Sequence, residues 1–182
     1  MLSSYALFKV FDWLCESSGH ESIRGVAAKA GVGVSTAKRC CDYLFSKEIV
    51  VRNQIGRLYQ YRLNVDNVVA RHLKIARTLA RIQDAELVKE ISSRNPQITS
   101  VVLYGSAAAG TDNPTSDLDL LIVSRSLCKL HDIKSERKLN REVSYIVCTR
   151  SEWRKKSIHE KPFYENVILG GIALFGELPV VT

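Results

Sequence analysis

The sequence contains little that would indicate a secreted, membrane-bound or zinc-stabilised protein. Its five cysteines form an odd number and include no CxxC pair, which argues against a disulfide framework and a zinc site. No stretch approaches the about 18 apolar residues of a membrane-spanning helix, and Lys9 and Asp12 interrupt the apolar residues of the first segment, unlike a signal peptide. We therefore expect a cytoplasmic protein with no membrane partner and with reduced, mostly buried cysteines.

Histidines at metal-ligand spacing are also missing, as is any arrangement of Ser, His and Asp or of Cys and His that would indicate a hydrolytic nucleophile. Low-complexity tracts and internal repeats are absent. An apolar fraction of 46% and a charged fraction of 25% are typical of a folded globular chain, which excludes a disordered one. A length of 182 residues allows one large domain or two small ones.

The net charge of +7 is distributed unevenly along the chain. Residues 1–65 carry 9 basic and 5 acidic side chains, whereas residues 98–182 carry 11 and 10. The positive excess in the first part favours nucleic acid as its partner, although a basic solvated surface has the same composition.

The first 64 residues predict three helices followed by a hairpin. Apolar residues recur at helical spacing in the first segment, Ser35 is the expected N-cap of the third helix, and turn residues separate two β-rich runs. The expected ranges are 2–17, 22–30 and 35–47 for the helices and 49–52 and Leu58–Leu63 for the strands, with a loop over residues 53–57. This order resembles the winged helix-turn-helix domains of prokaryotic transcription regulators, which implies double-stranded DNA as the partner.

In the third helix, Ala37, Cys41 and Leu44 form the expected buried stripe and leave the other faces available for DNA. Recognition helices present side chains near their amino-terminal end to base edges, and a wing contacts the backbone or the minor groove. The candidate DNA-binding residues are Ser35, Thr36, Lys38, Arg39, Arg52 and Arg57. The alternative is a winged helix that serves only protein contacts or dimerisation.

Residues 66–95 predict one long helix that ends before Pro96. It could link two domains or form a dimer interface. Many winged-helix proteins bind two-fold DNA sites as dimers, so we expect a homodimer with this helix as the first candidate interface. The expected domains are 1–64, 65–96 as the linking or dimerisation helix, and 97–182.

Residues 97–182 alternate strand and helix signals and predict a small mixed sheet, so that the expected fold class is α+β with two domains. The expected strands are Ile98–Tyr104, 118–123, 142–148 and 172–175, with a short helix after the first and a helix over 152–169 interrupted at Pro162. Arg154, Lys155 and Lys156, beside Trp153, could bind an acidic partner, but we interpret them as a solvated helix face.

The string VVLYGSAAAGTDNPTSDLDLLIVS, at residues 101–124, carries the chemistry. Gly105 permits close approach of a ligand. At the start of the following helix, the hydroxyl of Ser106 can donate a hydrogen bond to a phosphate. Asp117 and Asp119 alternate with apolar residues in a strand, so their carboxylates project from one face. Two neighbouring carboxylates repel each other unless a cation lies between them, and Mg²⁺ (or Mn²⁺) suits hard oxygen ligands.

This string resembles the signature of the DNA polymerase β-like nucleotidyltransferases, and in particular the minimal nucleotidyltransferases of bacteria and archaea. In these proteins a Gly-Ser pair, a ten-residue spacer and Asp-x-Asp recur. The resemblance implies that Gly105 and Ser106 bind the phosphates of a nucleoside triphosphate and that Asp117 and Asp119 bind the metal and act in catalysis.

The family usually carries a third carboxylate on a later strand, where it helps to activate the attacking hydroxyl. The best alignment puts Ser144 at that position, and Glu142, two residues earlier on the same strand face, is the candidate substitute. With only two carboxylates the site could bind Mg²⁺ and nucleotide yet lack an efficient base.

Two functions follow from these patterns. The first is a DNA-binding transcriptional regulator with a nucleotidyltransferase-like domain that binds Mg²⁺ and nucleotide. The second is an active nucleotidyltransferase that transfers a nucleoside monophosphate to a protein or RNA acceptor, in the manner of the minimal nucleotidyltransferases that act on a HEPN ribonuclease toxin. Asp117, Asp119 and Glu142 are the candidate catalytic residues for the second.

Overall fold

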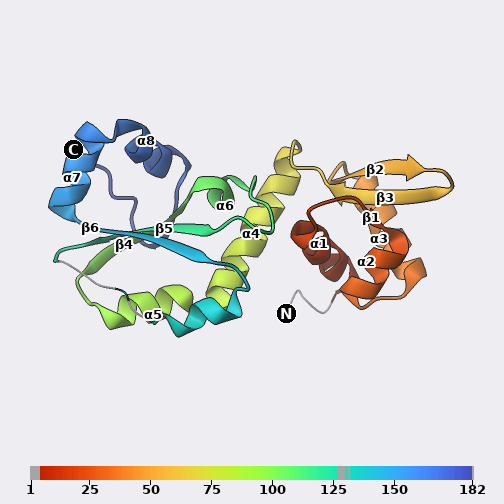
Figure 1. Ribbon diagram of the computed structural model, residues 1–182, viewed down its shortest axis with the longest axis horizontal. Coiled ribbons are helices and arrows are strands. Elements are labelled where there is room, and N and C mark those ends of the chain that lie inside the picture. Colours follow the sequence, from red (N-terminus) through yellow and green to blue (C-terminus); the bar gives the residue numbers. More distant parts are fainter. Residues whose placement is uncertain (1–4, 127–129, 131, 182) are drawn as a thin grey trace. The chain divides into compact units, whose positions relative to one another are not determined.

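The chain folds as two units, Met1–Arg77 (unit 1) and Thr78–Thr182 (unit 2), which are drawn in Figure 1. The computed structural model describes residues 5–126, 130 and 132–181. Residues 2–4 of the expected first helix and the cysteine at position 128 lie outside the described residues. In the described part of the chain, no helix has the length and apolar character needed to cross a membrane.

Unit 1 contains three helices and a three-stranded antiparallel sheet with the strand order β1-β3-β2. Its elements are α1 (Ala6–Glu16), β1 (Glu21–Ser22), α2 (Ile23–Ala30), α3 (Val34–Ser46), β2 (Val50–Ile55), β3 (Leu58–Leu63) and the first part of α4 (Val68–Asp84). The apolar faces of the helices and of β3 meet in one core, where Leu14, Cys41 and Tyr61 are almost completely buried.

The N-caps of α2 and α3 determine where these helices of unit 1 begin, and the N-cap of α3 differs from the expected one. The Ser22 hydroxyl accepts a hydrogen bond from the Gly25 N–H at 3.1 Å and caps α2. The N-cap of α3 is Gly33 and makes no side-chain bond, so the expectation that Ser35 caps this helix is wrong. Glycine is an acceptable N-cap, and the helix begins one residue earlier than its polar residues suggested.

The hairpin after α3 is longer than expected. β2 and β3 pair from Val50 with Leu63 to Ile55 with Leu58, so residues 53–55 belong to the strand. Gly56 has a φ of +60° and lies with Arg57 in a two-residue turn. Turn residues such as Asn53 predict a loop, but the two-residue turn lets the ladder of backbone hydrogen bonds continue through them.

The long helix expected over residues 66–95 is two helices, α4 (Val68–Asp84) and α5 (Leu87–Arg94). Glu86, with a φ of +60°, breaks the helix, and both Ala85 and Leu87 are buried on either side of the break. The break lets the apolar side chains of α5 turn toward the core of unit 2. Neither glycine nor proline marks this position, so the tertiary packing overrides the helical pattern of the sequence.

Unit 2 is built on a mixed four-stranded sheet with the strand order β6-β5-β4-β7. β5 and β6 are parallel, and the other two pairs are antiparallel. After α4 and α5, the elements are β4 (Ile98–Tyr104), α6 (Gly105–Ala109), β5 (Leu118–Ser124), the 3₁₀ helix η2 (Lys134–Lys138), β6 (Val143–Thr149), α7 (Arg150–His159), α8 (Lys161–Gly170) and β7 (Ile172–Gly176).

Helices cover both faces of this sheet, with α5 on one side and α7 and α8 on the other (Figure 1). Alternate residues of the two central strands therefore enter different cores. Leu103 and Leu120 pack with the apolar side chains of α5, whereas Val102 and Leu121 pack with Trp153 of α7 and its neighbours. Because β4 and β5 are buried on both faces, they read as continuous apolar runs in the sequence.

The remaining elements of unit 2 correct the expectations in detail. The interruption expected at Pro162 in the helix over residues 152–169 lies at Glu160, between α7 and α8, and Pro162 lies in the first turn of α8, where its missing N–H has no cost. The strand expected over 142–148 begins at Val143, so Glu142 lies outside it. Among the described cysteines, Cys15, Cys40, Cys41 and Cys148 form no disulfide, and all except Cys40 are buried.

Candidate nucleotide site and nucleic-acid surface

The candidate nucleotide site begins where β4 ends, at Gly105. This residue has a φ of +71°, a conformation that side chains other than glycine adopt at a cost. A Cβ atom built on Gly105 would lie 2.7 Å from the Oδ2 atom of Asp119. The backbone at the start of α6 therefore approaches a carboxylate as closely as only glycine allows.

The strand register brings three side chains into one row across the sheet. Tyr104 of β4 pairs with Asp119 of β5, and Asp119 pairs with Ser144 of β6. Asp119 is half-buried, and its neighbours Leu118 and Leu120 are buried on the opposite face. Because pairing partners share a face of the sheet, the hydroxyl of Ser144 lies on the same side as the carboxylate of Asp119.

The electrostatics around Asp119 favour a cation. Burial raises the pKa of the Asp119 carboxyl, the negative charge of Asp117 raises it further, and Arg141 opposes both. A positive ion beside the two carboxylates would relieve this repulsion and restore the charged form. The residues present therefore fit Mg²⁺, which commonly takes one or two protein carboxylates and completes its shell with waters and substrate phosphates.

Ser106 follows Gly105 in the first turn of α6 and is half-buried. The two residues after it, Ala107 and Ala108, are buried and fix this turn against the sheet. The pairing of β4 with β5 thus brings Gly105 and Asp119 together, Ser106 follows Gly105 in α6, and Asp117 lies exposed just before β5.

Glu142, the candidate third carboxylate, lies just outside β6. This residue is exposed and precedes β6, and its backbone C=O accepts a hydrogen bond from the Leu118 N–H at 2.9 Å. Residues 5–126, 130 and 132–181 contain no group of three or more His, Cys, Asp or Glu side chains that could hold a metal. The expectation that Glu142 completes the carboxylate set is therefore not supported by the geometry.

Arg141 is the residue of this site that the sequence reading missed. Its side chain is 8% exposed, and its Nη1 atom lies 2.7 Å from the Oδ2 atom of Asp112, whose side chain is 3% exposed. The same guanidinium donates to the backbone C=O of Ser116, at 2.8 Å from Nε, and to that of Asp117, at 3.2 Å from Nη2. Arg141 thereby fastens the loop that carries Asp117 into β5.

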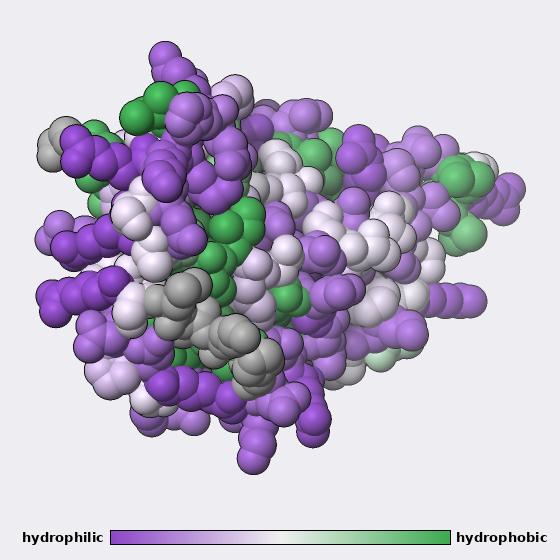
Figure 2. Space-filling view, turned by 60° about the vertical axis from the view of Figure 1, so that its left-hand side comes forward, coloured by the Kyte–Doolittle hydropathy of each residue, from purple (hydrophilic) through white to green (hydrophobic). Residues whose placement is uncertain are grey.

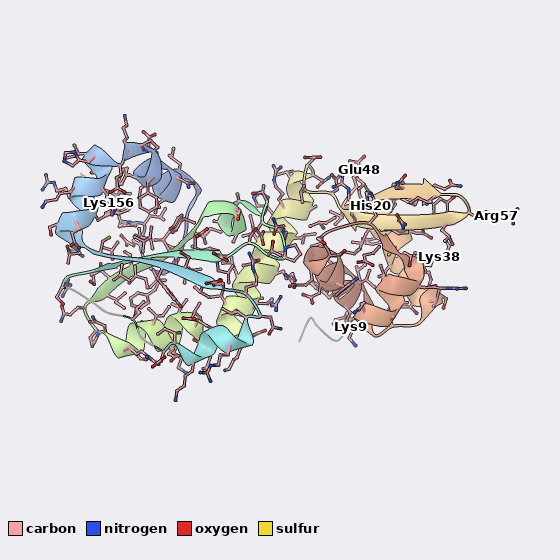
Figure 3. The ribbon with its side chains drawn as sticks, in the orientation of Figure 1. Lys9, His20, Lys38, Glu48, Arg57 and Lys156 are labelled. Carbon is pink, nitrogen blue, oxygen red and sulfur yellow. The ribbon has the colours of Figure 1, made fainter. Side chains whose placement is uncertain are left out.

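Unit 1 presents a basic surface on α3 and the hairpin. Ser35, Lys38 and Arg39 are exposed on α3, and Thr36 is half-buried. Arg57 is exposed in the turn of the hairpin, and Figure 3 shows Lys38 and Arg57 on the same side of the unit in that view. All six candidate DNA-binding residues are therefore at the surface in part or in full, Arg52 included.

Arg52, the sixth candidate, is held inside unit 1's own contacts. The centre of its guanidinium lies 4.3 Å from the Phe45 ring centroid and 4.4 Å from that of Tyr59. It also lies 3.9 Å from Asp42, which accepts hydrogen bonds from Lys38 and, at 3.0 Å, from the Tyr61 hydroxyl. Arg52 therefore joins the hairpin to α3, since stacked and paired arginines are positioned by several contacts at once.

Comparison with known proteins supports the assignment of unit 2. Residues 85–167 match the family model of the nucleotidyltransferase domain. No curated protein matches the chain at a significant level.

Two solved structures are similar to parts of the chain. The crystal structure of hypothetical protein PyrSV_gp04 from Pyrobaculum spherical virus shares 17% identity over 52% of this chain and 57% of that chain, with a TM-score of 0.30. The crystal structure of HmgR from Pseudomonas aeruginosa shares 14% identity over 73% of this chain and 53% of that chain, with a TM-score of 0.34. The chain spans somewhat more than half the length of each, and these scores establish no shared fold.

Proposed function

We propose that this protein is a DNA-binding regulator whose unit 2 binds a nucleoside triphosphate together with Mg²⁺ (or Mn²⁺). One observation carries the nucleotide part. The backbone of Gly105 lies against the carboxylate of Asp119, beside the charge of Asp117, within the residues that match the nucleotidyltransferase domain.

The residues of the site have separate tasks in this proposal. Gly105 and Ser106 offer a backbone N–H and a hydroxyl to the phosphates, and Asp117 and Asp119 hold the metal, which would neutralise phosphate charge. Ser144 occupies the row beside Asp119. A serine hydroxyl has no basic group to accept the proton of an attacking acceptor, so the proposal assigns binding, without efficient transfer, to this site.

Unit 1 supports the DNA part through its shape and its charge. Three helices followed by an antiparallel hairpin form the arrangement in which a recognition helix enters the major groove. Lys38 and Arg39 on α3 and Arg57 in the hairpin turn would contact phosphates and bases, with Ser35 and Thr36 near the start of α3. The complex with duplex DNA should weaken steeply as salt rises.

A homodimer through α4 is part of the proposal. Val69, Leu73 and Ala76 are exposed on this helix at spacings of four and three residues, and so form one apolar stripe. Val69 is 53% and Leu73 40% exposed. A second copy of the same stripe would cover them and would place two copies of α3 on a two-fold DNA site. A Leu73→Glu variant that stays as dimeric as the native protein in sedimentation would contradict this interface.

The first experiment measures nucleotide binding, which needs no acceptor. Calorimetry and thermal shift with Mg²⁺ and each nucleoside triphosphate compare the native protein with an Asp117→Ala, Asp119→Ala double variant. At about 100 times the dissociation constant, ligand adds about 2.7 kcal/mol to the free energy of unfolding. Binding by the native protein alone supports the proposal, and absence of binding by both proteins overturns the nucleotide part.

Active transfer is the second candidate, and the match of residues 85–167 to a transferase family favours it. In that case the protein attaches a nucleoside monophosphate from the triphosphate to a protein or RNA acceptor, with a HEPN-type partner as one candidate. Incubation with α-labelled nucleotides and cell lysate should then label an acceptor. An Asp119→Ala variant is the control, and label on the acceptor in both samples would exclude this site as its source.

A further inference from the structure

A cavity lies at the other end of the sheet that carries the nucleotide site. Its volume is about 680 Å³, and it is lined by the beginning of β4 at Thr99 and Ser100, the end of β5 at Val123, the first half of α7, and the terminal segment after β7. Tyr104 and Asp119 stand at the opposite ends of the same two strands. Five residues of strand separate Thr99 from Tyr104, which corresponds to about 16 Å.

The walls of this cavity are fixed by hydrogen bonds. The indole N–H of Trp153 donates to the Pro179 C=O at 2.6 Å, and the Ser100 hydroxyl donates to the Glu177 C=O at 2.7 Å. The Val181 N–H donates to the Tyr164 hydroxyl at 2.8 Å. The terminal segment is therefore held against α7 and the sheet.

Two arginines of α7 line the cavity, and among the described residues their guanidinium groups have no partner. Arg150 and Arg154 are exposed and lie one helical turn apart, and the guanidinium group of neither makes a hydrogen bond or an ion pair with a residue that the structure describes. The nearby Glu152 is engaged in the helix cap, where its carboxylate accepts hydrogen bonds from the Thr149 N–H at 2.7 Å and hydroxyl at 2.8 Å. Glu177 is the carboxylate among the lining residues.

The positions of the two arginines are unfavourable for the fold alone. Arg150 is the first residue of α7, where the positive end of the helix dipole repels a cation. Like charges four residues apart on one helix face destabilise it further. Both costs disappear when a negative group lies between the two guanidinium groups.

The rest of the lining is mixed: Val123, Leu178, Pro179 and Val181 lie beside the Trp153 ring, and Thr99, Ser100 and Glu177 add polar groups. Figure 2 brings this end of unit 2 forward and shows apolar surface between projecting hydrophilic side chains. A volume of this size lies in the range of small-molecule sites, which combine apolar surface with a few converging polar groups.

We propose that this cavity binds a small organic anion, whose phosphate or carboxylate group lies between Arg150 and Arg154 and whose apolar body packs against the terminal segment. The ligand is a small organic anion, either a phosphate ester or a carboxylate. The site is separate from Gly105, Ser106, Asp117 and Asp119, so the proposal does not depend on nucleotide binding.

The test follows the indole N–H signal of Trp153 in nitrogen-15 NMR spectra of the full chain. The sequence has two tryptophans, and a Trp13→Phe variant assigns the signal. Phenyl phosphate and benzoate are titrated separately to about 10 mM, which largely occupies a millimolar site. Benzylamine, with the same ring and the opposite charge, is the ligand control. No Mg²⁺ or nucleotide is present.

We expect a saturable shift of the Trp153 signal with at least one of the two anions and no shift with benzylamine. An Arg150→Ala, Arg154→Ala variant should bind at least tenfold more weakly. An Arg137→Ala, Lys138→Ala variant removes the same charge from exposed positions of η2 and should bind as the native protein does. The anion that binds more tightly shows whether the site prefers a phosphate ester or a carboxylate. An unmoved signal, an equal shift with benzylamine, or equal binding by the Arg150, Arg154 variant would overturn the proposal.

Discussion

The two units present their candidate binding residues in opposite ways. In unit 2, Gly105 and Asp119 lie at the ends of strands that are buried on both faces, and the buried pair of Arg141 and Asp112 holds the adjoining loop. In unit 1, Lys38 and Arg57 extend from the surface, and the ion-pair partner of Lys38, Asp42, is itself partly exposed. The nucleotide site should therefore fail when a single supporting residue changes, whereas the basic surface should weaken by small increments.

The largest effect is expected from Arg141→Met. The change leaves the carboxylate of Asp112 buried without its ion-pair partner and removes the donors to Ser116 and Asp117. Breaking a buried pair on one side costs about 3–5 kcal/mol. Urea unfolding should show this loss for the transition of unit 2, and nucleotide binding should fall because the loop that carries Asp117 loses its anchor.

The control for this prediction removes both charges. An Arg141→Met, Asp112→Leu variant leaves no buried charge uncompensated, so it should recover part of the lost stability. Nucleotide binding should stay weak, because the backbone carbonyls of the loop still lack their donors. If Arg141→Met unfolds at the same urea concentration as the native protein, the ion pair of Arg141 with Asp112 does not support the site.

The second-largest effect is expected from Gly105→Ala. The residue has a φ of +71°, and its new Cβ would lie 2.7 Å from Asp119. Backbone strain of this kind costs on the order of 1–3 kcal/mol, and the displaced carboxylate should bind Mg²⁺ and nucleotide more weakly. Thermal unfolding and calorimetry measure the two effects separately.

Gly31→Ala in unit 1 is the matched control. Gly31 has a φ of +62° at the end of α2, but a Cβ there would meet nothing within 4 Å. The strain in the backbone is therefore similar and the contact is absent. Equal losses of stability for the two variants, with unchanged nucleotide binding in Gly105→Ala, would show that the close approach to Asp119 has no role.

The contrast between the units also explains what could be read from the sequence. Gly105, Ser106, Asp117 and Asp119 belong to one continuous motif, and the apolar runs of β4 and β5 on either side indicate buried strands by themselves. Local pattern therefore sufficed for the position of the candidate site.

Features that depend on contacts across the fold could not be read in this way. Arg141 meets Asp112 only because β5 and β6 pair in parallel, and Arg52 meets Phe45 and Tyr59 only when the hairpin folds beside α3. The end of α4 depends on the packing of Leu87 in unit 2, and no glycine or proline at this position predicts it from the sequence. Long-range pairing leaves no periodic signal along the chain.

The basic surface of unit 1 should respond to single changes by about 1 kcal/mol or less each. For each phosphate contact that Lys38→Ala, Arg39→Ala or Arg57→Ala removes, the slope of log affinity against log salt should fall by about 0.9. Mobility shifts or fluorescence anisotropy with duplex DNA at several salt concentrations measure the slope. Slopes equal to that of the native protein in all three variants would place the DNA contacts elsewhere.

The smallest effects are expected from Asp42→Asn, and they should have opposite signs for stability and for DNA binding. The hydrogen bond from Lys38 is the main cause that lowers the pKa of the Asp42 carboxyl, and the Tyr61 hydroxyl adds to it. Because the folded pKa lies below the unfolded value, this contribution is fully present above about pH 4 and is lost as the pH falls through the folded pKa. Partly exposed pairs of this kind contribute less than about 1 kcal/mol.

At pH 7 the variant should therefore be slightly less stable than the native protein in urea unfolding, and the difference should disappear in acid. Its affinity for duplex DNA should rise, because the change frees the Lys38 ammonium and removes a negative charge beside the proposed contact surface. The gain should shrink as salt screens the phosphates. Weaker DNA binding by Asp42→Asn at low salt would instead mean that the ion pair positions Lys38 for its contact, and that part of unit 1's surface is preorganised as the site in unit 2 is.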